Sequence, residues 1–85
     1  MNESKSRITI LERNLVEKRL STRGWVCIAD DFFGKAVRIV REKSGDQFFI
    51  KPKGYDEVRS TRYHASPYVD DLSNREITLE EYYEF

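Results

Sequence analysis

The amino-acid sequence predicts an α+β fold, in which an N-terminal helix packs on a three-stranded antiparallel β-meander and a loop-rich C-terminal part ends in a short helix or a fourth strand. Two observations carry this prediction. Apolar residues recur at helical spacing over about residues 10–22, and they alternate with other residues in short runs between residues 25 and 51. A helix that precedes neighbouring strands can cover their apolar face, which is typical of this class.

The N-terminal helix is predicted from a capping box and an apolar stripe. Thr9 and Glu12 have the spacing at which the two side chains satisfy free amide groups at a helix start. The stripe contains apolar residues three or four positions apart, namely Ile8, Leu11, Leu15, Val16 and Leu20. Gly24 is a favourable stop. Because Ile8 and Ile10 also alternate like a short strand, the position at which the helix begins stays open.

The meander is predicted from three apolar runs. Residues 25–29 form the first strand, residues 30–34 connect it to a hairpin, and the hairpin turns at Lys43–Asp46. Because side chains alternate between the two faces of a strand, six apolar residues are expected to share one face. They are Val26, Ile28, Val37, Ile39, Phe48 and Ile50. The opposite face is then basic, with aromatic residues on it.

The C-terminal part is harder to interpret. Pro52, Gly54 and Pro67 interrupt regular patterns, so residues 52–71 are predicted to be mostly loop. Residues 73–76 and 78–81 both have capping-box spacing, which favours a short terminal helix. Apolar residues also alternate after residue 76, at Ile77, Leu79, Tyr83 and Phe85, which favours a fourth strand instead.

Length and composition indicate one small domain over residues 1–85. The 39% hydrophobic content and eleven aromatic residues are enough for a core, although one of marginal size. A single cysteine excludes an internal disulfide and a cysteine-based zinc cluster. No apolar run is long enough for a signal peptide or a membrane span, so a soluble cytoplasmic protein without a cofactor is expected.

The charges are unevenly distributed along the chain. Residues 1–62 hold 14 Lys or Arg and 9 Asp or Glu, a net charge of +5, whereas residues 63–85 hold one Arg and 6 acids, a net charge of −5. A basic body with an acidic tail is typical of proteins that bind other macromolecules. Alternatively, the tail folds back and neutralises the body within the monomer.

Catalysis is not predicted. His64 stands alone in a polar segment without an obvious nucleophile and orienting carboxylate, and Cys27 lies between two apolar residues like a buried thiol. The acidic pairs Asp30–Asp31 and Asp70–Asp71 lack the spaced oxygen ligands of a calcium loop. The sequence therefore predicts no enzyme and no metal site.

The first functional hypothesis is binding of RNA or single-stranded nucleic acid. Cations attract phosphates while aromatic rings stack on bases, and the sequence mixes both on the predicted basic face and the loop after it. The candidate residues are Trp25, Arg38, Arg41, Lys43, Phe49, Lys51, Lys53, Tyr55, Arg59, Arg62 and Tyr63. If the C-terminal segment instead covers Trp25 and Phe49, the basic residues form an ordinary surface.

The second hypothesis is a protein-binding inhibitor, because small size and dense charge suit proteins that block a larger partner. Examples of that class are toxin inhibitors (antitoxins) and phage anti-host or anti-defence factors. The acidic tail would dock on the basic site of a nucleic-acid-handling enzyme, through Asp70, Asp71, Glu76, Glu80, Glu81 and Glu84. The two hypotheses are compatible if the complex also contains RNA.

Overall fold

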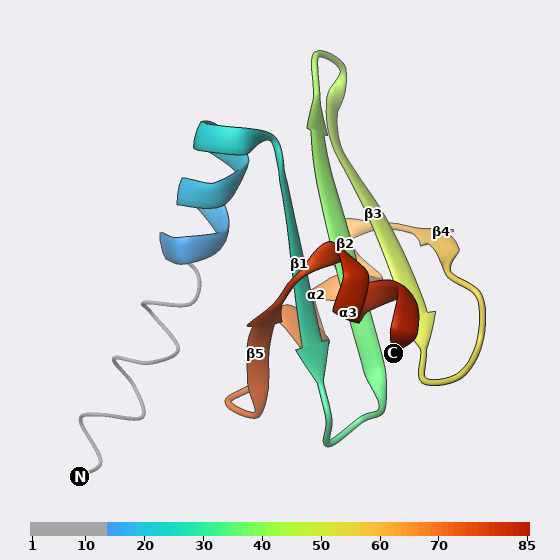
Figure 1. The fold of residues 1–85 in the computed structure, drawn as a ribbon. Helices are drawn as coiled ribbons and strands as arrows, with labels where there is room; N and C mark the ends of the chain where they lie inside the picture. Colours follow the sequence, from blue (N-terminus) through green and yellow to red (C-terminus); the bar gives the residue numbers. More distant parts are fainter. Residues whose placement is uncertain (1–13) are drawn as a thin grey trace, which may run out of the picture.

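The computed structural model describes residues 14–85 and shows an α+β fold built on a five-stranded antiparallel sheet. The strand order is β4-β3-β2-β1-β5. A helix whose described part covers residues 14–23 comes first. The elements after it are β1 (Trp25–Asp30), β2 (Lys35–Glu42), β3 (Gly45–Pro52), β4 (Val58–Ser60), α2 (Arg62–Val69), β5 (Asn74–Ile77) and α3 (Leu79–Glu84). Figure 1 shows α3 in front of the sheet and α2 behind it.

Strands β1, β2 and β3 form an antiparallel meander as predicted, but within a five-stranded sheet. Val26 pairs with Ile39, and Val37 pairs with Ile50. The hairpin is tighter than predicted, because β3 already begins at Gly45, which has a φ of +123° that a side chain would disfavour. The turn between β2 and β3 therefore needs only Lys43 and Ser44.

The six predicted apolar residues do share one face, which we call the apolar face. Its buried core includes Val26, Val37 and Phe48, and Ile50 packs against it. Two helices cover it. Val16 and Leu20 come from the N-terminal helix, whereas Ala65, Tyr68 and Val69 come from α2. The predicted N-terminal helix is thus only part of the cover. Leu15, also of the predicted stripe, is half-buried in this helix. Ile8 and Leu11 of the stripe and the predicted cap Thr9–Glu12 lie outside the described residues.

The prediction of a mostly irregular segment over residues 52–71 is wrong. It contains β4, which pairs with β3 through Val58 and Ile50, and it contains α2. Thr61 caps α2, since its side chain accepts a hydrogen bond from the backbone N–H of His64. Sequence analysis missed this helix for two reasons. Pro67 lies inside it, although proline disfavours a helix interior, and Ala65 is its one buried residue, so its sequence has no apolar stripe.

The C-terminal end contains both alternatives, a strand and a helix. Residues 73–76, one of the two predicted capping boxes, instead lie mostly within β5, which pairs with β1. The second box is confirmed, because the Thr78 side chain accepts from the Glu81 N–H while the Glu81 side chain accepts from the Thr78 N–H. This cap turns the chain out of the sheet edge, so that α3 lies across the face opposite the apolar face, which we call the mixed face.

Candidate binding surfaces

The mixed face is half covered by α3, and small side chains make room for the helix. Cys27, Ala29 and Ala36 form a second buried cluster with Ile77, and the Tyr82 ring of α3 fills the space above them with no exposed surface. Lys51, a predicted nucleic-acid contact, is 6% exposed and lies with its Nζ 5.9 Å from the ring centre of Phe85. The covered half is thus a second core and offers no binding platform.

Arg38 is held by this second core. Its guanidinium donates to both carboxylate oxygens of Glu57, at 3.1 and 2.8 Å, and lies 4.1 Å from the ring centre of Phe49. The Tyr82 hydroxyl donates to Glu57 Oε1 at 2.7 Å. The bond to Arg38 lowers the pKa of Glu57, whereas burial raises the pKa of Tyr82. Arg38 is therefore a structural residue that joins the sheet to α3.

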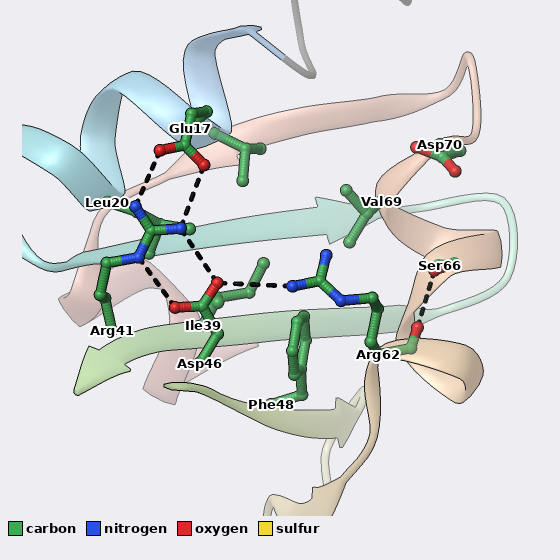
Figure 2. A pocket seen from close by; sticks show the side chains of 11 residues that line it. Glu17, Leu20, Ile39, Arg41, Asp46, Phe48, Arg62, Ser66, Val69 and Asp70 are labelled. Carbon is green, nitrogen blue, oxygen red and sulfur yellow. Dashed lines mark hydrogen bonds and ion pairs between the residues drawn. The ribbon is translucent and has the colours of Figure 1, made fainter. Parts of the chain in front are cut away.

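Arg41 and Arg62 lie on the opposite side of the sheet, around a pocket of about 290 Å³ between the N-terminal helix and α2. Figure 2 shows the Arg41 guanidinium between two carboxylates, with Glu17 at 2.8 Å and Asp46 at 2.9 Å. Arg62 reaches Asp46 at 3.6 Å. The Arg41 hydrogen bonds lower the pKa of Glu17 to about 2. Two arginines thus face two acids, and Asp70 also lines the pocket, so no net positive charge remains here.

The uncovered half of the mixed face keeps part of the predicted mixture of cations and aromatic rings. The Arg23 guanidinium lies 3.8 Å from the ring centre of the half-buried Trp25, an arrangement that sequence analysis did not identify. Phe49 is also half-buried, and the exposed Arg59 beside it hydrogen-bonds Gln47. We call Arg23, Trp25, Phe49 and Arg59 the open half of the mixed face.

The other predicted nucleic-acid residues do not join this surface. Lys43 is in the turn between β2 and β3, whereas Lys53 and Tyr55 are in the loop after β3, at the opposite end of the sheet. Tyr63 is the second residue of α2 and is 83% exposed. The structure therefore divides the predicted site between both faces and both ends of the sheet.

The predicted acidic tail is divided as well. Glu76 is half-buried and accepts hydrogen bonds from Arg19 at 2.9 Å and Arg23 at 3.3 Å, which lower its pKa. Glu81 closes the helix cap, and Asp70 ends α2. Glu80 and Glu84 remain exposed on α3. Of the predicted acids, Glu76 therefore pairs with arginines of the basic body, whereas the exposed acids of α3 make its outer surface acidic.

The two residues considered for catalysis, His64 and Cys27, lie in surroundings that do not activate them. His64 is exposed and its Nδ1 lies 3.0 Å from the Thr61 hydroxyl. Burial raises the pKa of Cys27 to about 12, so its thiol stays protonated near neutral pH. Within residues 14–85, no three His, Cys, Asp or Glu side chains are grouped so that they could hold a metal ion.

Sequence analysis missed the end of the sheet where three connections meet, which we call the loop end. Figure 1 shows there the turn between β1 and β2, the loop after β3 and the turn before β5. The Lys53 N–H donates to the Gly34 carbonyl at 3.0 Å, so two of these segments are tied together. Large apolar side chains are exposed on all three, namely Phe32, Phe33, Tyr55 and Leu72.

The turn 31–34, which we call the docking turn, presents two exposed phenylalanine rings side by side at the loop end. Phe32 is 76% exposed and Phe33 is 50% exposed, and their rings meet edge to face at 4.9 Å. The buried Asp30 fixes the backbone beneath them, because its Oδ1 accepts the N–H groups of Phe32 at 3.0 Å and Phe33 at 3.3 Å. In the sequence, this turn could have been found from the adjacent pair Phe32 and Phe33, which directly follows the aspartates at 30 and 31.

No protein-family model matches the chain, and neither a curated protein nor a solved structure is significantly similar to it. None of the helices in residues 14–85 is long and apolar enough to cross a membrane.

Proposed function

We propose that this chain is a non-enzymatic protein-binding inhibitor that docks on a larger partner through the loop end. The observation that carries the proposal is the exposure of Phe32 and Phe33 on one turn. Single exposed apolar residues are ordinary, but several large ones gathered at one end indicate an interaction site. Aromatic side chains that enter a pocket of the partner commonly supply most of the binding energy of an interface.

The backbone of the docking turn supports this function because it is already ordered. Asp30 holds two successive N–H groups, and the tie between Lys53 and Gly34 braces the turn from the next loop. A rigid turn loses little conformational freedom on binding, so more of the contact energy appears as affinity. Burying Phe32 and Phe33 in a partner would remove apolar area from water at a low entropic cost.

The charges near the loop end indicate the chemistry of the partner. The C-terminal end of α3 reaches this region, since the Gly54 N–H donates to the Phe85 carbonyl at 2.8 Å. Glu84, the last residue of α3 and the one before Phe85, is exposed there. A partner with an apolar pocket and a basic rim would suit both features. Nucleic-acid-handling enzymes have basic substrate sites, so we place the partner in that class.

Site-specific photocrosslinking tests the proposal. Phe32 is replaced by benzoylphenylalanine, and the matched control carries the same group in place of Tyr63, which is even more exposed but lies on α2. Native lysate is crosslinked with and without ribonuclease. We expect one protein to crosslink through position 32 in both conditions and no protein through position 63.

The affinity of the identified partner is then measured with two alanine variants. Phe32→Ala should weaken binding by at least about 30-fold, the loss typical of an interface hot spot of ~2 kcal/mol. Tyr63→Ala should bind like wild type. Equal crosslinking through both positions, or an unchanged affinity of Phe32→Ala, would rule out the docking turn as the anchor.

Binding of single-stranded nucleic acid is a second proposal, favoured by the open half of the mixed face. Trp25 of β1 has Arg23 above it, and Phe49 of β3 has Arg59 of β4 beside it, so rings and cations lie on one face of the sheet, with β2 between the two pairs. Such surfaces hold bases by stacking and phosphates by charge. This site is smaller than the predicted one, because Lys51 is buried and Arg38 and Arg41 are paired with acids. Arg23 is also paired, with Glu76 at 3.3 Å, so Arg59 is the cation on which phosphate binding at this site depends.

A salt titration with a single-stranded RNA oligomer tests the second proposal. Log affinity should fall with log salt by about 0.7 for each phosphate that is neutralised, so Arg59→Ala should flatten the slope by about that amount. Lys53→Ala, which removes the same charge at the loop end, should leave the slope unchanged. If wild type binds no oligomer tighter than ~10⁻⁴ M at low salt, the open half does not bind nucleic acid.

A further inference from the structure

Two lysines lie beside one phenylalanine ring, where α3 ends against the loop after β3. The Lys51 Nζ is 5.9 Å and the Lys53 Nζ is 5.8 Å from the ring centre of Phe85. The Gly54 N–H donates to the Phe85 carbonyl at 2.8 Å, so the ring is tied to this loop. Within residues 14–85, neither Nζ forms a hydrogen bond or an ion pair with another group. Two positive charges therefore lie together without a counter-charge in contact.

Lys51 is the unusual member of the pair, because it is buried without an acidic partner. It is 6% exposed, and lysines this buried are normally paired. Its Nζ still reaches solvent, since the buried side-chain atoms without a hydrogen-bond partner in the described residues are two aspartate oxygens and no lysine nitrogen. The packed stem thus holds the ammonium group in place, at the margin of the half of the mixed face that α3 covers.

The acids around the two lysines do not occupy them. Continuing the register of β3 and β4 places Glu57 opposite Lys51, but both oxygens of Glu57 accept hydrogen bonds from Arg38. Asp56 and Glu84 are close along the chain, and both are exposed and form no ion pair with a residue of the described chain. Exposed charges are screened by water and salt. An anion that reaches this point would therefore meet two available cations.

We propose that Lys51 and Lys53 form a binding site for a phosphate monoester, the group found at the end of a nucleotide or at an RNA 5′ end. A monoester carries about −1.5 to −2 charges near pH 7, so it matches two lysines better than a singly charged carboxylate or internal phosphate of a nucleic acid. Each ammonium group offers three N–H donors to its oxygens. Burial fixes Lys51 before the ligand arrives, and the exposed Lys53 closes on it, so little freedom is lost on binding. This site goes beyond the proposed docking function and does not depend on it.

The first test is a titration with inorganic phosphate at constant ionic strength and about pH 7.5, where phosphate is mostly a dianion. The backbone amide NMR signals of Lys51, Lys53 and Gly54 should shift and saturate in wild type. Dimethyl phosphate, which carries one charge, should shift them much less. Lys51→Met keeps a buried stem without the charge and should weaken phosphate binding about tenfold, the effect of one charged hydrogen bond. Lys43→Met, which removes an exposed lysine at the opposite end of the sheet, should bind like wild type.

Three results would overturn the inference: shifts that do not saturate, equal binding of dimethyl phosphate and phosphate, or equal affinity of Lys51→Met and Lys43→Met. Lys53→Met is the second variant, because an exposed side chain can be replaced without disturbing the core. It should also weaken phosphate binding. Unchanged affinity in Lys53→Met would remove it from the site even if Lys51→Met failed to fold.

A second titration distinguishes the sources of the monoester. An RNA oligomer with a 5′-phosphate is compared with the same oligomer with a 5′-hydroxyl, which has internal phosphates alone. If the ligand is an RNA end, the phosphorylated oligomer should bind more tightly than inorganic phosphate. Tyr55→Ala should remove this advantage, because Tyr55 is 72% exposed in the same loop and offers a ring to the base. Equal affinity would identify a small phosphate compound instead and would still support the site.

The 5′-hydroxyl oligomer should leave the Lys51 and Lys53 signals unchanged, and shifts equal to those of the phosphorylated oligomer would overturn the preference for a monoester. The salt titration of the open half therefore uses a 5′-hydroxyl oligomer, for which Lys53→Ala is a valid control. None of these measurements uses a partner protein, so failure here leaves the Phe32 crosslinking result standing.

Discussion

Individual side chains on this sheet have roles that follow from which face they occupy. Phe48 and Phe49 are neighbours in sequence, yet Phe48 belongs to the core of the apolar face while Phe49 lies under the Arg38 guanidinium on the mixed face. Alternation predicted this division correctly. It could not predict that Arg38 would be bound by Glu57, because that contact joins residues 19 positions apart and depends on α3.

The two phenylalanines provide a direct test at the residue scale. Phe48 is 8% exposed, so Phe48→Ala should lower the free energy of unfolding by about 3 kcal/mol, through lost burial and the space left behind. Phe49→Ala should cost less than half as much, since its ring is partly open to solvent. Urea denaturation of both variants gives the comparison. Equal losses would mean that the mixed face contributes as much to the core as the apolar face.

At the scale of elements, the sequence predicted strongly periodic segments and missed short ones. The meander has six alternating apolar residues, whereas β4 has three residues in all and α2 buries only Ala65. Neither leaves a pattern that can be distinguished from loop. The capping box of Thr78 and Glu81 did predict α3, but capping shows where a helix starts and not which surface it covers. Part of the face that was predicted to bind nucleic acid is therefore covered by α3.

The attachment of α3 can be measured through Cys27, which is fully buried in the cluster that Tyr82 closes. Thr78→Ala removes the cap and should weaken α3 by about 1 kcal/mol. If local opening of α3 exposes the thiol, a thiol reagent should then label Cys27 about fivefold faster. Ser21→Ala, which removes a hydroxyl from the N-terminal helix, is the control and should label like wild type. Equal acceleration in both variants would show that Cys27 is exposed by global unfolding instead.

For the whole molecule, the basic body and the acidic tail are paired in part by contacts within the chain. Glu76 of the acidic tail binds Arg19 and Arg23 of the basic body, and Arg75 of the tail binds Asp31. Residues 70–85 are also structural, because they contain β5 and α3. Removing them would take away an edge strand and the cover of the mixed face, so point substitutions at the loop end are the informative way to test binding.

The sheet order also determines when the molecule can become stable during synthesis. Both edge strands, β4 and β5, follow the meander in sequence, and β5 returns to pair with β1 some 50 residues earlier, as in Cys27 and Ile77. A nascent chain that ends after β3 has neither α2 on the apolar face nor α3 on the mixed face. Contacts between distant residues close slowly, because loop entropy is lost before they form. While the chain emerges from the ribosome, the mixed face of the meander therefore stays accessible to chaperones until α3 has been made.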